Sequence, residues 1–432
     1  MSFITDKQTL DDLGLLGKFK QHSVFSIFNK VKTAGGERLL SQWFHEPLSY
    51  RQAINARSAI FQYFHEAKLR FPYDSTSFAV VEHYMSSVAS GNAVAGLAGI
   101  ARKKFAGAFL HDEQYKQLQK SLLATIDALL SLKKLAGLIS IPLVQQARSI
   151  LESKRLQWLP EAANGKLSMI STARFDNLLR NTLRNEMEML LDTIYQLDVY
   201  IAVSTVAREQ GFSYAQALPA EENVFEATAL RHPGLSNAVA NPLNLDGSIN
   251  MMFLTGANMA GKSTFMKSFG IAVYLAHMGF PVAAGEMVFS VKDGLYSSIN
   301  VPDNLSMGYS HFYAEVLRVK SVALEVSRGK NMVVIFDELF KGTNVKDAYD
   351  ATLSVTKAFS RYRNCFFIIS THIIEVGEAL RPDHSNLQFA YLPTVMKGPV
   401  PSYPYRLTEG ITDDRHGMII IENEKILELM KA

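Results

Sequence analysis

Residues 250–264 read NMMFLTGANMAGKST, and this stretch decides how the rest of the chain is interpreted. An apolar run of strand length, Asn250 to Thr255, leads into a loop with the pattern G-x-x-x-x-G-K-S, and a helical run follows from Phe265. In this strand–loop–helix setting the pattern is typical of nucleotide-binding proteins. The glycines let successive backbone N–H groups turn toward phosphate oxygens, and the N-terminus of the following helix adds positive potential.

The loop therefore predicts a phosphate site with ATP and Mg²⁺ as cofactors. The Lys262 ammonium is expected to contact the β- and γ-phosphates, and the Ser263 hydroxyl is expected to ligate Mg²⁺. The predicted nucleotide-binding residues are Gly256, Ala257, Asn258, Met259, Ala260, Gly261, Lys262, Ser263 and Thr264.

Polar side chains follow two further runs of strand length. Asp337 and Glu338 come after residues 332–336, and His372 closes the Ser-Thr-His that follows residues 366–369. Strand ends that converge on one edge of a parallel sheet would bring these side chains to the phosphates. We expect Asp337 to hold Mg²⁺ directly or through its waters, Glu338 to polarise the attacking water, and His372 to lie near the γ-phosphate. The plainer interpretations are a helix-capping acidic pair and a structural histidine.

Composition narrows the class of protein. The chain has 432 residues, 48% of them hydrophobic, a net charge of +3 and one cysteine, Cys365. A single cysteine excludes a disulfide framework and a Cys-rich zinc site, and Cys365 is expected to be a small core residue. The first residues carry no signal-peptide pattern, and the longest apolar stretches are interrupted or too short to span a bilayer. We therefore expect a cytoplasmic protein that does not associate with membranes.

The sequence pattern changes near residue 215. Residues 10–210 are predicted to be helical almost throughout, and strand-length runs alternate with helices afterwards. The predicted fold class is α/β, with a helical domain at 1–215 and an ATPase domain at 216–432. Residues 1–220 hold 25 Lys and Arg against 19 Asp and Glu, an excess that permits contact with phosphates. One long helix is indicated by an apolar stripe of Phe175, Leu179, Leu183, Met187, Leu190, Ile194, Leu197 and Ile201.

The sequence resembles the MutS family of DNA mismatch-repair ATPases. The Asn258-Met259 pair inside the phosphate loop is a mark of that family which generic loops lack. Residues 231–233 (RHP), 240–245 (ANPLNL) and 303–315 also resemble family segments, the last being its signature segment. In the helical half the resemblance includes residues 35–40 (GGERLL), 45–48 (HEPL), 54–57 (INAR) and 197–199 (LDV).

The resemblance implies an ABC-type P-loop ATPase domain preceded by an all-α lever and core domain. It also implies a homodimer in which each nucleotide lies between one subunit's phosphate loop and the other's signature segment. Ser310 would then reach the partner's γ-phosphate, and His372 would sense or orient the attacking water. The helical half would transmit the ATP state away from the ATPase, with double-stranded or branched DNA as the expected partner.

The sequence also departs from the family pattern. The core match begins near Leu13, so the mismatch-reading domain of about 100 residues is not expected. Residues 86–109, with Arg102, Lys103 and Lys104 near their end, are expected to form a loop at the tip of a helical arm. The arm between the levers is expected to be short, and the single short helix predicted at 422–430 implies a truncated C-terminal dimerisation element. His311 follows the signature serine where threonine is usual. Ala238 stands where many relatives have a phenylalanine that packs on adenine, which predicts looser base recognition.

Two functional alternatives remain open on sequence alone. The chain could be an ATP-switched scaffold whose helical arm binds proteins and not DNA, or an unrelated P-loop enzyme such as a small-molecule kinase. The Ser310 signature and the helical lever argue against the kinase. DNA binding across a salt series discriminates the DNA-binding ATPase from the scaffold.

Overall fold

The computed structural model describes residues 3–17, 23–87, 108–165, 167–299, 311–382, 385–397, 400–412 and 429–430. Among these residues, no helix is both long enough and apolar enough to cross a membrane. Ser310, the basic run Arg102-Lys103-Lys104 and most of the helix predicted at 422–430 lie outside the described ranges. The roles assigned to them therefore stay predictions.

The chain packs into two compact units. Unit 1 contains Met1–Phe28, Trp43–Tyr63 and Ser204–Ala432, and unit 2 contains Asn29–Gln42 and Phe64–Val203. The early segments join unit 1 because Phe28, Phe44 and Phe61 pack against Phe280, with ring centroids 4.9–5.6 Å apart. The two units are defined by packing, whereas the predicted boundary at residue 215 is defined by a change of sequence pattern. The predicted domains at 1–215 and 216–432 therefore stay a prediction.

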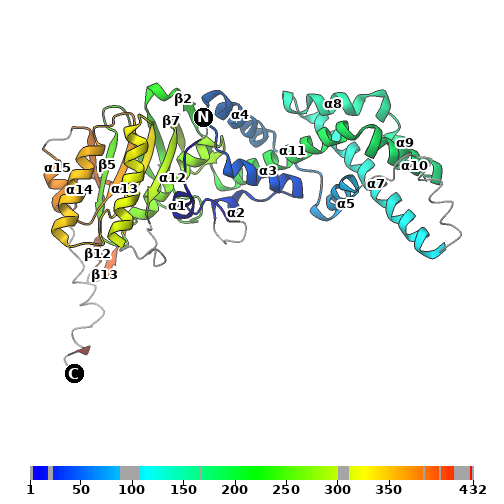
Figure 1. Ribbon diagram of the computed structural model, residues 1–432. Coiled ribbons are helices and arrows are strands. Elements are labelled where there is room, and N and C mark those ends of the chain that lie inside the picture. The colour runs from blue at the N-terminus through cyan, green and yellow to red at the C-terminus, as the bar shows by residue number, and fades with distance from the viewer. Residues whose placement is uncertain are drawn as a thin grey trace. The chain divides into compact units, whose positions relative to one another are not determined.

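Unit 2 is helical in all its described secondary structure, as the apolar periodicity predicted. Three helices have residues in both units: α3 (Ala34–His45), α4 (Arg51–Ala67) and α11 (Arg184–Gln210) (Figure 1). The helices wholly in unit 2 are α5 (Ser75–Ser86), α7 (Ala108–Leu138), α8 (Gln145–Glu152), α9 (Leu159–Asn164) and α10 (Met169–Asn177), with 3-10 turns at Pro142–Val144 and Lys154–Leu156.

The long helix predicted from residue 175 to residue 201 is interrupted, which corrects that prediction. A π-helical turn, Leu178–Thr182, separates α10 from α11, and Leu183 N donates to Leu178 O at 2.8 Å. The turn lies beside a buried ion pair, in which Arg180 Nε donates to Asp176 Oδ1 at 2.7 Å and Tyr84 donates to the same oxygen. The widened turn lets the polar pair and the apolar stripe both face inward. An apolar period alone carries no signal for it.

Unit 1 is a mixed α/β unit built on a six-stranded sheet. The sheet has the order β14-β11-β5-β10-β9-β8, and all neighbours are parallel except the edge strand β14. The three strands predicted from apolar runs are confirmed, with each observed boundary within one residue of the predicted run. The strands are β5 (Met251–Gly256), β8 (Gly294–Ser298), β9 (Met332–Asp337), β10 (Phe366–Ser370), β11 (Leu387–Leu392) and β14 (Thr408–Glu409).

Helices cover both faces of this sheet, which explains why its central strands β5, β10 and β9 are largely apolar. On one face, Val334 and Phe367 belong to a buried cluster with residues of α13 (His311–Ser327), α14 (Val345–Phe359) and α15 (Ile374–Leu380) (Figure 1). The other face carries α12 (Lys262–His277), where a Cβ added to Gly270 would lie 2.9 Å from Ile335 Cδ1. Cys365 is fully buried, as predicted.

A second sheet of four strands, in the order β2-β7-β3-β4, completes the α/β part of unit 1. Its strand β4 starts at Asn241, so the preceding segment, residues 231–240, leads from β3 to that point. The remaining elements of unit 1 are β2 (Gln216–Leu218), β3 (Phe225–Leu230), β4 (Asn241–Leu245), β7 (Glu286–Ser290), the pairs β1 (Ser213–Tyr214) with β6 (Pro281–Val282) and β12 (Val395–Lys397) with β13 (Val400–Ser402), a 3-10 turn at Ala220–Glu222, and helices α1 (Lys7–Asp12) and α2 (Val24–Phe28).

Candidate nucleotide-binding site

Three predicted strand ends meet at one edge of the six-stranded sheet. Parallel pairing aligns Ser370 of β10 with Asp337 of β9 and with Leu254 of β5, and β5 ends two residues later at Gly256. Parallel strands have their carboxyl ends at the same edge of the sheet, and α/β folds bind ligands at that edge. The convergence predicted from the three strand-length runs is therefore confirmed.

The loop after β5 has a backbone that depends on its glycines. Gly256 and Gly261 have φ values of +141° and +102°, and Met259 between them has φ +71°. A Cβ added at Gly256 would lie 2.9 Å from Leu392 O, and one added at Gly261 would lie 2.9 Å from the Tyr405 ring. Both positions need glycine for conformation and for space. The loop passes directly into the N-terminus of α12.

Lys262 is held inside the curl of this loop. Its Nζ donates to Gly256 O at 2.7 Å and to Ala257 O at 3.2 Å, and the residue is 5% exposed. Burial lowers the pKa of Lys262, while the nearby carboxylates of Glu338 and Asp337 act in the opposite direction. An anion bound in the loop would replace the neutral carbonyl partners of the ammonium with charged ones.

A short hydrogen-bonded chain links the loop to the neighbouring strand ends. The Ser263 hydroxyl donates to Asp337 Oδ2 at 2.5 Å, and the Ser370 hydroxyl donates to Asp337 Oδ1. A hydroxyl and a carboxylate are the hard oxygen ligands that Mg²⁺ takes from proteins, usually with phosphate oxygens and water completing its shell. The two residues predicted for Mg²⁺ thus have the chemistry and the proximity that this ion requires.

Glu338 follows Asp337 with an unusual backbone. Its φ is +54°, and its N–H donates to Ser370 O at 3.0 Å, which fixes the turn after β9. A left-handed glutamate is strained, and such strain persists where the surrounding structure imposes it. The side chain lines the cavity beside the phosphate loop, and Lys341 Nζ lies 3.9 Å from Glu338 Oε2.

His372 differs from the other predicted residues. It lies two residues beyond Ser370 at the same sheet edge, but it is exposed and is not among the residues that line the cavity. Its catalytic role stays a prediction. The cavity does bring together Ala257, Asn258, Met259, Gly261, Lys262, Ser263, Thr264 and Glu338.

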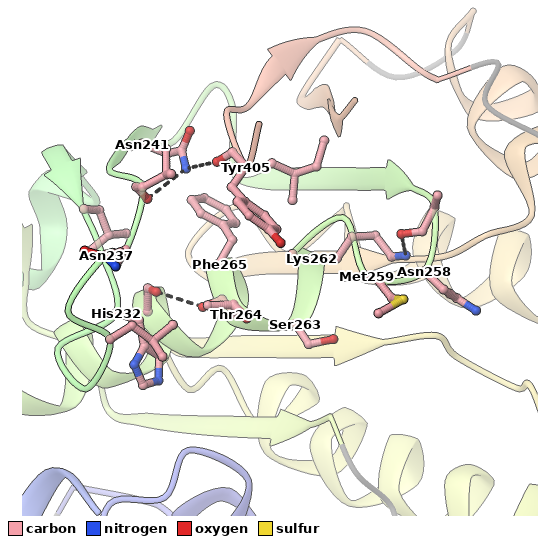
Figure 2. A pocket seen from close by; sticks show the side chains of 18 of the residues that line it. His232, Asn237, Asn241, Asn258, Met259, Lys262, Ser263, Thr264, Phe265 and Tyr405 are labelled. Carbon is pink, nitrogen blue, oxygen red and sulfur yellow. Dashed lines mark hydrogen bonds between the residues drawn. The ribbon is translucent and has the colours of Figure 1, made fainter. Parts of the chain in front are cut away.

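The cavity has a volume of about 680 Å³ and extends from the phosphate loop to a second wall (Figure 2). That wall consists of residues 235–239, and Tyr405 also lines the cavity. The sequence pointed to Ala238 in this wall but not to Tyr405. Figure 2 shows the Tyr405 ring pointing from its backbone toward the phosphate loop. The cavity that Ala238 lines without the expected phenylalanine is therefore also lined by an aromatic ring. No sequence signal marks Tyr405, because it lies 141 positions after Thr264 and outside any recognised motif.

His232 contributes to the same wall. Gly234 N donates to its Nδ1 at 3.2 Å, and burial, followed by the charge of Lys267, lowers the pKa of His232. The ring is therefore neutral at neutral pH and leaves Lys262 as the cation that lines the cavity among the described residues.

Comparisons with known proteins agree with this arrangement. Residues 8–204 match the family model of MutS domain III, and residues 252–428 match that of MutS domain V. The DNA mismatch repair protein MutS of Leuconostoc citreum is 29% identical over 217 residues, which are 49% of this chain and 24% of that protein. The MutS protein of Thermus thermophilus is 31% identical over 216 residues (49% and 26%), and the Drosophila melanogaster mismatch repair protein spellchecker 1 is 26% identical over 238 residues (53% and 26%). The matched part is about a quarter of each of these relatives.

Proposed function

This chain belongs to the MutS family, and from that membership and the site we propose that it is a DNA-binding ATPase of DNA mismatch repair or recombination. Its ATPase domain would be of the ABC type, with a phosphate-binding P-loop at residues 256–264. ATP and Mg²⁺ would be its cofactors.

One observation carries the proposal. A single cavity holds the buried ammonium of Lys262, the Ser263 hydroxyl bonded to Asp337, and the carboxylate of Glu338. These groups supply phosphate binding, metal ligation and a base, which are the three requirements of ATP hydrolysis. A structural role for Asp337 and Glu338 would not require either of them to meet the phosphate loop.

The residues suggest a division of labour in hydrolysis. Lys262 and the loop N–H groups would bind the β- and γ-phosphates. Ser263 and Asp337 would hold Mg²⁺, which when bound neutralises charge on the phosphate oxygens. Glu338 would accept a proton from a water whose oxygen bonds to the γ-phosphorus, while the bond from that phosphorus to the oxygen of ADP breaks. Tyr405 would stack on the base at the far end of the cavity.

The DNA-binding part of the proposal is supported by the relatives, which are named DNA mismatch repair proteins. The homodimer with composite sites rests on the signature segment, whose Ser310 is proposed to complete the partner's site. The helical residues matched by domain III would link the state of the nucleotide to DNA.

Phosphate release from ATP tests the proposal directly. We expect the full chain to release phosphate with Mg²⁺, to stop when EDTA removes the metal, and to change its rate when duplex or branched DNA is added. A chain that binds ATP and Mg²⁺ but releases no phosphate under any of these conditions would contradict the enzymatic part of the proposal.

A further inference from the structure

Asn241 lies where two distant parts of the chain meet beside the cavity. It is the first residue of β4, where it pairs with Leu230 of β3. Its side chain reaches away from that sheet: Nδ2 donates to Tyr405 O at 2.9 Å, and Leu407 N donates to Oδ1 at 2.7 Å. The Asn241 side-chain amide thus forms hydrogen bonds with the backbone of both Tyr405 and Leu407.

The same amide also contacts the wall at residues 235–239. Asn241 Nδ2 lies 3.5 Å from Val239 O, at the end of the segment that includes Ala238 (Figure 2). Asn241 is 6% exposed, so its amide is largely removed from water and depends on these partners. The side chain therefore ties the wall at residues 235–239 to the segment that carries Tyr405.

The described contacts of Tyr405 include the Asn241 amide at its carbonyl oxygen and the Tyr403 ring, with centroids 6.3 Å apart. The backbone of Tyr405 is left-handed, with φ +57°, and the residue is 45% exposed. Its ring nevertheless approaches the phosphate loop closely at Gly261. A left-handed tyrosine on an open surface is a strained conformation that the surrounding bonds must impose.

We propose that Asn241 is a positioning residue that holds Tyr405 at the distance from residues 238–239 that a nucleotide base requires. The inference rests on the proposed nucleotide site and assigns its base end. Asn241 would not touch the ligand. It would set the width of a slot in which the aromatic ring of the base is held between Tyr405 and residues 238–239. Because phosphates bind at the loop, the slot would affect ligands that have a base and leave those without one unchanged.

Calorimetric titration with ATP and with inorganic tripolyphosphate, both with Mg²⁺, separates the two ends of the site. Base stacking on an aromatic side chain predicts that Asn241→Ala and Tyr405→Ala each weaken ATP binding by about tenfold. Both variants should bind tripolyphosphate within about twofold of the wild type, since the phosphate loop is unchanged. Tyr405→Phe should bind ATP like the wild type, because stacking uses the ring and not the hydroxyl.

Two controls distinguish positioning from general damage. Asn244→Ala removes an exposed asparagine from the same strand and should change neither affinity. The double variant Asn241→Ala/Tyr405→Ala should bind ATP no more weakly than Tyr405→Ala alone, because the two residues act as one unit. If Asn241→Ala does not fold, Asn241→Asp serves: it keeps the Oδ1 acceptor, loses the Nδ2 donor, and should show the same selective loss.

Equal weakening of both ligands, or additive losses in the double variant, would overturn the positioning role and leave the nucleotide site intact. A wild-type chain that binds neither ATP nor tripolyphosphate would instead contradict the proposed function itself.

Discussion

The Ser263 hydroxyl donates a hydrogen bond of 2.5 Å to the Asp337 carboxylate across 74 positions of sequence. Ser263 lies in the first turn of α12, and Asp337 is the last residue of β9. Their contact joins the phosphate loop to the strand that also delivers Glu338. Ser370 donates to the other oxygen of Asp337, so the first turn of α12 and the ends of β9 and β10 meet at one carboxylate. In the proposed site, these hydrogen bonds would hold the oxygen ligands of Mg²⁺ in place.

Replacement of Glu338 by glutamine should separate binding from hydrolysis. The amide keeps the size of the side chain but cannot accept a proton from water, so phosphate release should fall by roughly 100-fold or more. ATP affinity should stay within about twofold, since Lys262 and the loop are unchanged. Single-turnover phosphate release and an ATP titration measure the two quantities. Hydrolysis at the wild-type rate would remove Glu338 from the mechanism.

Trapped ATP should drive dimer formation. If Ser310 of one subunit completes the nucleotide site of the other, the Glu338→Gln chain should dimerise with saturating ATP and Mg²⁺. Its mass measured by light scattering should then double. A mixed dimer of one Ser310→Arg subunit and one Lys262→Ala subunit should retain one working nucleotide site at most. A monomeric Glu338→Gln chain at high concentration would show that the composite site is wrong.

DNA affinity should depend steeply on salt. Contacts to phosphates release counterions, so affinity for duplex DNA should fall on the order of 10-fold or more between about 50 and 200 mM salt. Alanine at Arg102, Lys103 and Lys104 should reduce both affinity and salt slope. The matched control is alanine at Lys133 and Lys134, which are exposed on α7.

The same titration tests which DNA structure is preferred. Phosphate contacts carry no information about a mispair, so this chain should bind a perfect duplex and a G·T mismatch alike, with any preference going to a four-way junction. A strong preference for the mismatch would contradict this expectation. No DNA binding at low salt would favour the scaffold alternative.

Acidic pH should destabilise unit 1 through His277. The imidazole is fully buried, with Nδ1 3.0 Å from Leu48 O, and Lys292 N donates to its Nε2 at 3.3 Å. Burial lowers the pKa of His277 to about 4. The unfolded chain, with a pKa of about 6.5, therefore binds more protons between these values. The stability is complete above about pH 6.5 and decreases by about 3 kcal/mol as the pH falls to about 4.

Urea unfolding in a Trp158→Phe background measures this loss, because Trp43 then reports on unit 1, where it packs near Phe280. His277→Gln should be less stable at neutral pH, and its free energy of unfolding should depend less on pH between about 6.5 and 4. Identical pH profiles for wild type and variant would contradict the assignment.

The sequence predicted the glycine loop and the convergence of strand ends well because local chemistry determines both. Glycines at 256 and 261 are required by backbone conformation, and apolar runs of strand length place Asp337 and Ser370 at one sheet edge. Such requirements leave a pattern within a few residues. The strands were therefore located to within one residue.

The base end could not be predicted because it depends on tertiary contacts without local patterns. Tyr405 lines the cavity and has a left-handed backbone. Its carbonyl oxygen accepts a hydrogen bond from Asn241, 164 positions away in the sequence. The π-helical turn at Leu178–Thr182 was missed for a similar reason, since it accommodates the buried pair of Asp176 and Arg180. The sequence marks the missing aromatic at position 238 but carries no signal for Tyr405.

The central claim is that residues 256–264 bind ATP through Lys262, and one calorimetric comparison tests it most directly. Two charge-assisted hydrogen bonds of about 1.5 kcal/mol each predict that Lys262→Ala weakens ATP binding about 100-fold or more. Lys267→Ala is the matched control, since this lysine lies on α12 but does not line the cavity, and it should bind ATP like the wild type. Equal ATP affinity in the wild type and Lys262→Ala would contradict the assignment of the site.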